Sequence, residues 1–193
     1  MIKRLDLNEI KDVYRTLMTK DFSRYERRPF HLIKSLYRKG NYACIVLEDE
    51  QQVIAYAAFI VDDTKNSVLL DYFAVDKNQR GSGVGSLFLS QLTEYWTEKS
   101  GIIIECEAPD SAQTDSEKTI CNRRIDFYIR GGAENTSVRW RMFGGEYKVL
   151  WLPINTNLAR PDVACDLAGL YSLSLLPPLR PLFIRKKLKQ AES

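Results

Sequence analysis

A glycine-rich segment in the first half of the chain constrains the fold more than any other feature. Ser67–Val75 is an apolar run, and Arg-Gly-Ser-Gly-Val-Gly-Ser follows it at positions 80–86. Beyond the glycines, apolar residues recur at helical spacing: Val84, Leu87, Phe88, Leu92, Tyr95 and Trp96. The pattern predicts a strand, a tight turn and a helix. Because glycines lack Cβ atoms and the first amides of a helix are unpaired, this turn is predicted to bind a phosphate group.

Two familiar phosphate-binding turns fit the segment poorly. A P-loop requires Gly-Lys-Ser/Thr, and no lysine follows these glycines. A dinucleotide-binding turn, G-x-G-x-x-G, is matched by Gly81 and Gly83, but Ser86 stands at its third glycine. Glu105 lies where a ribose-binding acid would be, although such a turn normally opens its domain and here a long stretch precedes it. A nicotinamide-dependent oxidoreductase therefore stays an alternative, carried by these few residues.

A third pattern, R-x-x-G-x-G, is met by Arg80, Gly83 and Gly85. It resembles the pyrophosphate-binding motif of the GNAT family of N-acetyltransferases, and Tyr128 followed by Gly132 resembles the family's fourth-helix signature. The chain departs from that signature in lacking its N-x-x-A spacing and in having alanine where the family has phenylalanine. The resemblance extends over about residues 1–155.

The resemblance implies an α/β fold: a central mixed, mostly antiparallel twisted sheet flanked by helices, whose parallel fourth and fifth strands splay apart. Residues 1–155 would form the acyltransferase domain, and residues 156–193 a helical and basic extension packed on it or trailing it. The expected activity is transfer of an acetyl group from acetyl-CoA to a primary amine of a small molecule or protein. The alternative is a catalytically silent domain that binds acyl-CoA as a sensor or interaction module.

The family's cofactor contacts carry over to particular positions of this sequence. The pantetheine arm would bond the backbone of one strand end, and the pyrophosphate would bond the glycine turn. Asn122 matches a residue that often touches the arm. The expected cofactor-binding residues are Phe73, Ala74, Val75, Arg80, Gly81, Ser82, Gly83, Val84, Gly85, Ser86 and Asn122.

Transfer from a thioester to an amine requires two proton movements, because the amine must lose a proton and the departing thiolate must gain one. Tyr128 matches the family tyrosine that donates to the leaving sulfur, although its helical spacing also suits a core aromatic residue. Glu105 and Glu107 alternate onto one face of their predicted strand, and Asp71 lies on the neighbouring strand. These acids could accept the ammonium proton or bind a cationic substrate. They could equally face solvent or form salt bridges.

Composition narrows the other function classes. A net charge of +3 gives no indication of a nucleic-acid partner, and the single histidine, His31, excludes most histidine-based nucleophile schemes and multi-histidine metal sites. Four cysteines without C-x-x-C spacing suggest free thiols in a reducing cytoplasm, and no metal is expected. No leader is visible, and no apolar run is long enough to span a bilayer. A monomer or homodimer is expected, and the sequence does not identify the amine.

The remaining elements are predicted from periodicity and from helix-capping and turn signals. Residues 102–107 should form a strand parallel to Ser67–Val75, because a helix over 83–99 connects the two. The other expected strands are 1–5, 42–48, 52–61 and Gly145–Pro153, and the other expected helices are 8–17, 29–40, 114–131 and 159–174. The segment around Trp140, Met142 and Phe143 is expected to be irregular. Pro177-Pro178 and Pro181 should end the last helix, leaving a basic, solvated end at 185–189.

Overall fold

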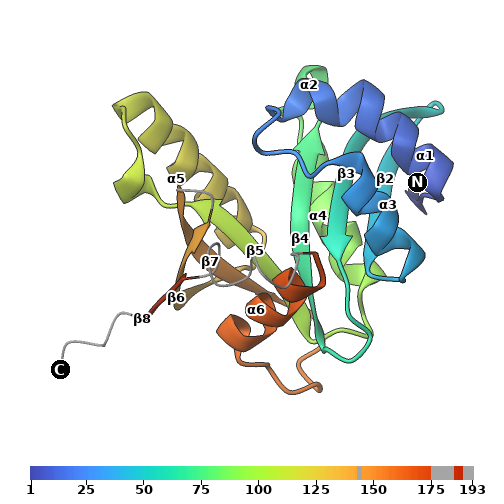
Figure 1. The fold of residues 1–193 in the computed structure, drawn as a ribbon. Helices are drawn as coiled ribbons and strands as arrows, with labels where there is room; N and C mark the ends of the chain where they lie inside the picture. The colour runs from blue at the N-terminus through green and yellow to red at the C-terminus, as the bar shows by residue number, and fades with distance from the viewer. Residues whose placement is uncertain (143–144, 175–184, 189–193) are drawn as a thin grey trace.

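The computed structural model describes residues 1–142, 145–174 and 185–188 of the chain. Within them, one sheet of eight strands has the order β1-β2-β3-β4-β5-β7-β6-β8 (Figure 1). The strands are β1 (Ile2–Arg4), β2 (Tyr42–Asp49), β3 (Gln52–Ile60), β4 (Ser67–Val75), β5 (Gly101–Glu107), β6 (Glu134–Met142), β7 (Gly145–Pro153) and β8 (Arg185–Leu188). The helices are α1 (Leu7–Val13), η1 (Tyr14–Met18), α2 (Thr19–Asp21), α3 (Phe30–Arg38), η2 (Lys77–Gln79), α4 (Val84–Tyr95), η3 (Pro109–Ser111), α5 (Asp115–Arg130) and α6 (Val163–Ser174).

The sheet opens between its two parallel strands. β4 and β5 pair from Ser67↔Gly101 to Leu70↔Ile104, and no pair follows although both strands continue. Beyond this point, β4 stays paired with β3 and β5 stays paired with β7, so the two parallel strands diverge (Figure 1). This arrangement, a mostly antiparallel sheet with parallel β4 and β5 that diverge, confirms the fold class predicted from the sequence.

A β-bulge marks the point where the strands separate. Ala58 of β3 pairs with Tyr72 and Phe59 pairs with Leu70, so Asp71 has no partner in the ladder. A bulge of this kind inserts one residue and bends its strand. Asp71 on β4 and Glu105 on β5 are therefore the first residues of the two diverging strand ends.

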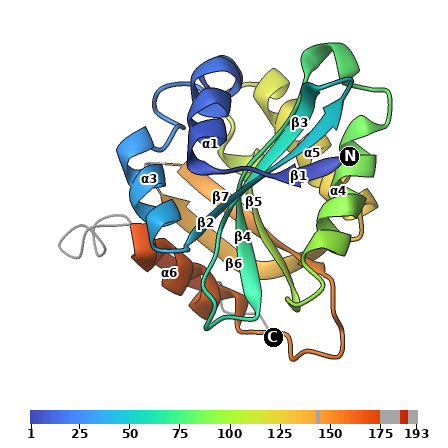
Figure 2. The same cartoon turned by 90° about the vertical axis from the view of Figure 1, so that its right-hand side faces the viewer.

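Helices cover both faces of the sheet (Figure 2). On one face, α4 and α5 bury Phe88, Leu92 and Ile125 against the sheet. On the other face, α1, α3 and α6 pack together and bury side chains that include Ile33 and Leu170. Helix α6 thus contributes to the same core as the N-terminal helices, and in the described residues no helix has the length and apolar character needed to cross a bilayer.

Helix α6 is fixed to the sheet by polar contacts as well as by packing. Its start is capped by Asp162, whose side chain accepts hydrogen bonds from the Ala164 and Cys165 amides. One turn later, the Asp166 carboxylate accepts hydrogen bonds from Lys65 Nζ at 2.8 Å and Ser67 Oγ at 2.6 Å. Because Ser67 is fully buried at the first position of β4, these bonds hold α6 against the paired end of the parallel strands.

The first helix differs from the prediction at both ends. It begins at Leu7, because Asp6 and Glu9 form a capping box, so Asn8 is not the cap. It does not end near residue 17, because a π-helical turn (η1) and then α2 continue it to Asp21. By contrast, the capping box expected at Thr114 and Glu117 is present at the start of α5, and α4 ends at Tyr95 rather than at residue 99.

The segment expected to be irregular is a strand, so that prediction was wrong. β6 pairs with β7, but its register shifts between Asn135 and Arg139, and Thr136 Oγ1 donates to the carbonyl of Val149. The shift breaks the alternation of buried and exposed residues, which explains why the strand was missed. Arg185–Leu188 pairs with β6 as β8, where a basic end was expected. Phe143, Pro177-Pro178, Pro181 and Lys189 lie outside the described residues.

Candidate active site

The glycine turn lies directly after the free end of β4. Gly81 and Gly83 have φ values of +84° and +92°, a region that residues with a side chain rarely adopt. Gly83 is the N-cap of α4, and the first bond of that helix runs from the Leu87 amide to the Gly83 carbonyl at 3.0 Å. The amides of Val84, Gly85 and Ser86 therefore precede the intrahelical ladder. A Cβ added at Gly81 or Gly83 would have no atom within 4 Å, so the surface over the turn is open.

Two further contacts hold this turn in place. The Nε atom of Arg80 donates a hydrogen bond to the Val75 carbonyl at 3.0 Å, and its guanidinium lies 3.8 Å from Asp21. Gly85 lets α4 pack closely, because a Cβ there would lie 3.4 Å from side-chain atoms of Val75 and Phe127. The turn thus offers unpaired amides and one exposed guanidinium at the open end of the diverging strands. These features suit a pyrophosphate group.

The inner edge of β4 is also available to a ligand. Phe73, Ala74 and Val75 pair with β3 on one side, and none of the strands that the structure describes adjoins them on the other. The Phe73 side chain is used for packing, with its ring centroid 5.6 Å from those of Phe88 and Phe127. The backbone of these residues on the inner side of β4 could therefore serve a molecule between the strands, as the family resemblance implies. Asn122 is exposed on α5, away from the buried stripe of that helix.

Tyr128 lies beside the diverging strands on the face covered by α5. Its ring is 6.0 Å from that of Phe73 on β4, and Cys106 of β5 is close enough to influence its ionisation. The residue is 6% exposed, and its hydroxyl forms no hydrogen bond with any residue that the structure describes. Burial raises the pKa of Tyr128 far above its usual value of 10, so the hydroxyl stays protonated at neutral pH.

Glu105 projects on the opposite side, toward α6. Its Oε2 atom accepts a hydrogen bond from the Tyr171 hydroxyl, while Oε1 is buried and has no partner among the described residues. Burial raises the pKa of Glu105 from 4.5 to about 7, and the hydrogen bond from Tyr171 opposes this rise. The carboxyl is therefore close to half-ionised at neutral pH, which suits a group that accepts and releases protons.

The structure does not bring Glu107 together with Glu105. Glu107 is exposed at the end of β5, where its Oε2 lies 3.4 Å from Arg124 Nη1 and 3.9 Å from Cys121 Sγ, both on α5. The alternation along the strand predicted one shared face for the two acids. Their carboxylates instead reach different helices, because Glu107 lies at the last position of the strand.

Asp71 is paired with an arginine that sequence reasoning had not singled out. Arg28, just before α3, donates two hydrogen bonds to the Asp71 carboxylate, from Nη2 at 3.0 Å and Nε at 3.2 Å. Both side chains are largely buried, and the Arg28 amide donates to the Tyr72 hydroxyl at 2.7 Å. This fork neutralises Asp71, whereas no lysine or arginine among the described residues forms an ion pair with Glu105.

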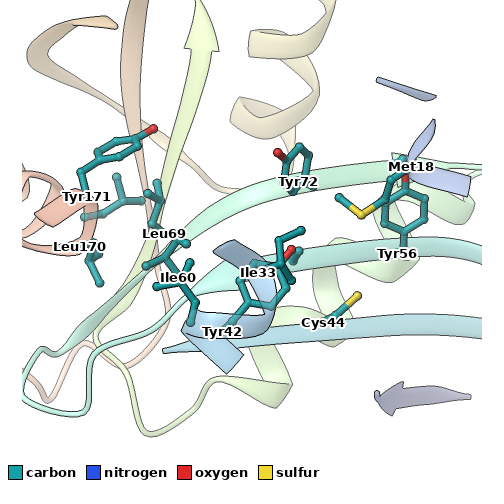
Figure 3. Close-up of a cluster of buried hydrophobic side chains, with 14 of the residues drawn as sticks. Met18, Ile33, Tyr42, Cys44, Tyr56, Ile60, Leu69, Tyr72, Leu170 and Tyr171 are labelled. Atoms are coloured by element: carbon teal, nitrogen blue, oxygen red, sulfur yellow. The ribbon is translucent and has the colours of Figure 1, made fainter. Parts of the chain in front are cut away.

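The second residue missed from the sequence is Tyr171, which contacts Glu105 from a helix 66 positions further along the chain. No local signal marks either Arg28 or Tyr171, since each is one of several similar residues in its segment. Figure 3 shows Tyr171 and Leu170 extending from α6 beside Leu69 of β4. In the described residues, no three His, Cys, Asp or Glu side chains gather as a metal site.

Comparison with known proteins agrees with this geometry. The family model of the acetyltransferase (GNAT) family matches residues 7–116, a range that includes the glycine turn and the strands β4 and β5. A curated but uncharacterised protein of Dictyostelium discoideum is 35% identical over 78 residues, which are 39% of this chain and only 18% of that protein. The match thus spans less than a fifth of that relative's length.

Solved structures share the fold at low sequence identity. A putative GNAT-family acetyltransferase from Bacteroides thetaiotaomicron has a TM-score of 0.65 and 19% identity, covering 90% of this chain and 95% of that one. The ribosomal-protein-S18-alanine N-acetyltransferase of Escherichia coli has a TM-score of 0.60 and 17% identity, with coverage of 84% and 97%. The aminoglycoside 6'-N-acetyltransferase of Enterococcus faecium has a TM-score of 0.61 and 15% identity, with coverage of 84% and 99%. Together, the diverging strands, the glycine turn between β4 and α4, and the matching family model show that this chain belongs to the acetyltransferase (GNAT) family.

Proposed function

We propose that the protein transfers the acetyl group of acetyl-CoA directly to a primary amine. The observation that carries this proposal is the opening between β4 and β5, with the glycine turn at its free end and two proton-transfer groups on its opposite sides. Tyr128 packs against the face covered by α4 and α5, and Glu105 bonds to α6 on the other face. A donor held between the strands would therefore be reached by an acid from one side and by a base from the other.

The residues of the turn fit the phosphate groups of acetyl-CoA. The amides from Gly81 to Ser86 would donate to the pyrophosphate, helped by the partial positive charge at the start of α4. Arg80 adds a full charge there. The unpaired backbone edge of Phe73, Ala74 and Val75 would bond the pantetheine arm, and exposed Asn122 is a further candidate contact. Acetyl-CoA supplies an acetyl thioester, and the chain's own residues bind it and move the protons.

Glu105 is the proposed base. An ammonium group must lose a proton before its nitrogen can attack, and a carboxyl with a pKa of about 7 is balanced between the two forms at neutral pH. Asp71 is a weaker candidate, because Arg28 holds it in an ion pair. Glu107 is exposed and forms an ion pair with Arg124, so it is also a weaker candidate than Glu105. Tyr128 is the proposed acid that returns a proton to the departing thiolate.

The acceptor is proposed to be a small-molecule or protein amine, without a nucleic acid or a metal. The free thiols of Cys44, Cys106, Cys121 and Cys165 support a reducing, cytoplasmic setting. A monomer or a homodimer would suffice, since every group invoked here comes from one chain.

Ligand-dependent unfolding tests the donor, and product analysis tests the reaction. At a hundredfold excess over its dissociation constant, a ligand that binds only the folded protein stabilises it by about 2.7 kcal/mol. We expect acetyl-CoA and CoA, but not NAD, to raise the unfolding temperature. We also expect an amine panel to release the CoA thiol and yield acetylated products by mass spectrometry. A shift with NAD alone would overturn the proposal, and a shift with acetyl-CoA but no product from any amine would favour the silent sensor.

A further inference from the structure

Tyr171 connects helix α6 to Glu105, the acid at the opening of the sheet. The residue is 4% exposed on α6, and its hydroxyl donates to Oε2 of Glu105 on β5. Glu105 is the first β5 residue beyond the last pair with β4, so α6 reaches the point where the strands begin to diverge. The family model ends at residue 116, well before this helix.

The tyrosine is held on several sides. Its ring stacks on Trp140 of β6, with centroids 5.9 Å apart and planes inclined by 17°. Its helix is anchored one turn earlier by Asp166, which binds Lys65 and Ser67. Figure 3 shows Leu170 and Tyr171 packed next to Leu69, with the Tyr171 hydroxyl directed away from Leu170. These contacts fix the position of the hydroxyl, and therefore fix the carboxylate oxygen that it binds.

The two oxygens of Glu105 have different surroundings. Oε2 is bound by Tyr171, whereas Oε1 is buried and has no partner among the described residues. A buried acceptor without a partner costs free energy, so it needs a reason to be retained, and use by a ligand is one. Among the described residues, the charged and titratable groups that interact with the carboxyl are Tyr171 on α6, Asp71 on β4, Arg28 before α3, Tyr147 on β7 and the neighbouring Cys106. Arg28 is already committed to Asp71, so Oε1 is left for a donor from outside the chain.

We propose that Tyr171 is a positioning residue for Glu105, holding Oε2 so that Oε1 is presented to the ammonium group of the acceptor. The proton-transfer step breaks one N–H bond of the ammonium and forms an O–H bond at Oε1, while the nitrogen keeps the electron pair. Tyr171 keeps its own proton throughout and stabilises the carboxylate before the transfer. The catalytic part of this inference rests on the proposed acetyl transfer, but the hydrogen bond between Tyr171 and Glu105 can be tested without an acceptor.

Replacing Tyr171 by phenylalanine removes the hydroxyl and keeps the ring on Trp140. Because the hydrogen bond opposes the rise caused by burial, its loss raises the pKa of Glu105 above about 7. A hydrogen bond to a charged group corresponds to a shift of about one pH unit or more. Because Glu105 must be ionised to act as a base, the variant has less of the active form at low pH. At pH values below the Glu105 pKa of both proteins, kcat/KM of the variant should be about tenfold lower than that of the parent, and the difference should disappear as the pH rises.

The first measurement is a pH titration of the Glu105 carboxyl carbon by NMR in protein labelled with ¹³C-glutamate, assigned through the spectrum of Glu105→Gln. We expect Tyr171→Phe to raise the midpoint by about one unit. Tyr56→Phe is the matched control, since it removes a hydroxyl that donates to the Asp21 carboxylate at 2.9 Å, and it should leave the Glu105 midpoint unchanged. An unchanged midpoint in Tyr171→Phe would overturn the inference.

The second measurement is the pH dependence of kcat/KM with the same variants and an active amine. The acidic limb should move with the NMR midpoint in Tyr171→Phe, and a limb that stays in place would reject the positioning role. Should Tyr171→Phe not fold, 3-fluorotyrosine can be placed at position 171, where it keeps the hydrogen bond but has a more acidic hydroxyl. The stronger hydrogen bond should then lower the midpoint of the NMR titration and the midpoint of the acidic limb of kcat/KM. A moved NMR midpoint in a protein that acetylates no amine would reject the proposed function while upholding the hydrogen bond.

Discussion

A substitution at Gly83 should change stability through backbone conformation alone, without a change in packing. Its φ of +92° disfavours any residue with a Cβ, yet a Cβ added there would meet no atom within 4 Å. Gly83→Ala should therefore cost only the backbone term, roughly 1–2 kcal/mol for a left-handed residue. In a chain of this size, 1 kcal/mol lowers Tm by about 2–4 °C, so we expect a loss of about 2–8 °C in the absence of ligand.

The backbone cost of alanine at position 83 can appear as lost affinity for acetyl-CoA instead of lost stability. If alanine lets the unliganded turn relax to a negative φ, the loss in Tm shrinks, and acetyl-CoA must then restore the strained conformation on binding. A cost of 1–2 kcal/mol would weaken binding by a factor of about 5 to 30. Calorimetric unfolding and titration calorimetry with acetyl-CoA together capture both forms of the loss.

Two further variants serve as controls. Gly40 also has a positive φ, +78°, with no atom within 4 Å of an added Cβ, but it lies after α3, in a separate turn from the glycine turn. Gly40→Ala should lose similar stability and keep its affinity for acetyl-CoA. Gly83→Asn should recover part of the loss, because asparagine tolerates positive φ better than alanine. The reasoning would be refuted by a Gly83→Ala protein that melts and binds acetyl-CoA like the parent.

Three other predictions concern the side chains at the opening of the sheet. Tyr128→Phe should lower kcat by about 10² to 10⁴ without changing the affinity for CoA, and equal single-turnover rates would exclude the acid role. Because burial raises the pKa of Glu105 from 4.5 to about 7, the folded state binds a proton that the unfolded state releases between these values. Unfolding free energy should therefore fall by up to about 3 kcal/mol from pH 4.5 to pH 7, and Glu105→Gln should remove this component in denaturant titrations. Asp71→Asn and Arg28→Met should each cost about 3–5 kcal/mol by leaving a buried partner unpaired; a double variant as unstable as the sum of the two would show that the pair is not coupled.

Local signals allowed much of the fold to be predicted. Ser67–Val75 and Gly145–Pro153 were bounded correctly, because turn residues flank each apolar run. The capping box at Thr114 located the start of α5, and the helical connection correctly predicted that β4 and β5 are parallel. β6 was missed because its register shift interrupts the alternation from which a strand is recognised.

The candidate site was predictable only where its residues follow one another along the chain. The glycine turn is such a case, and the sequence located it directly. The partners of the acids could not be predicted, since Arg28 reaches Asp71 across 43 positions and Tyr171 reaches Glu105 across 66. Contacts of this kind depend on how the helices pack against the sheet, and neither periodicity nor capping signals in the sequence indicate that packing.

The bonds of Asp166 to Lys65 and Ser67 have a consequence for how such a protein can diversify. Most of the residues that would hold the acetyl donor lie before residue 87, whereas Tyr171, which binds Glu105, and Trp140, which stacks on Tyr171, come from α6 and β6. Because the bonds of Asp166 fasten α6 to the closed end of the parallel strands, the attachment of the helix does not depend on the hydrogen bond between Tyr171 and Glu105 alone. We therefore expect substitutions on α6 to change the surroundings of Glu105 while the glycine turn before α4 stays intact, so the two parts can vary separately.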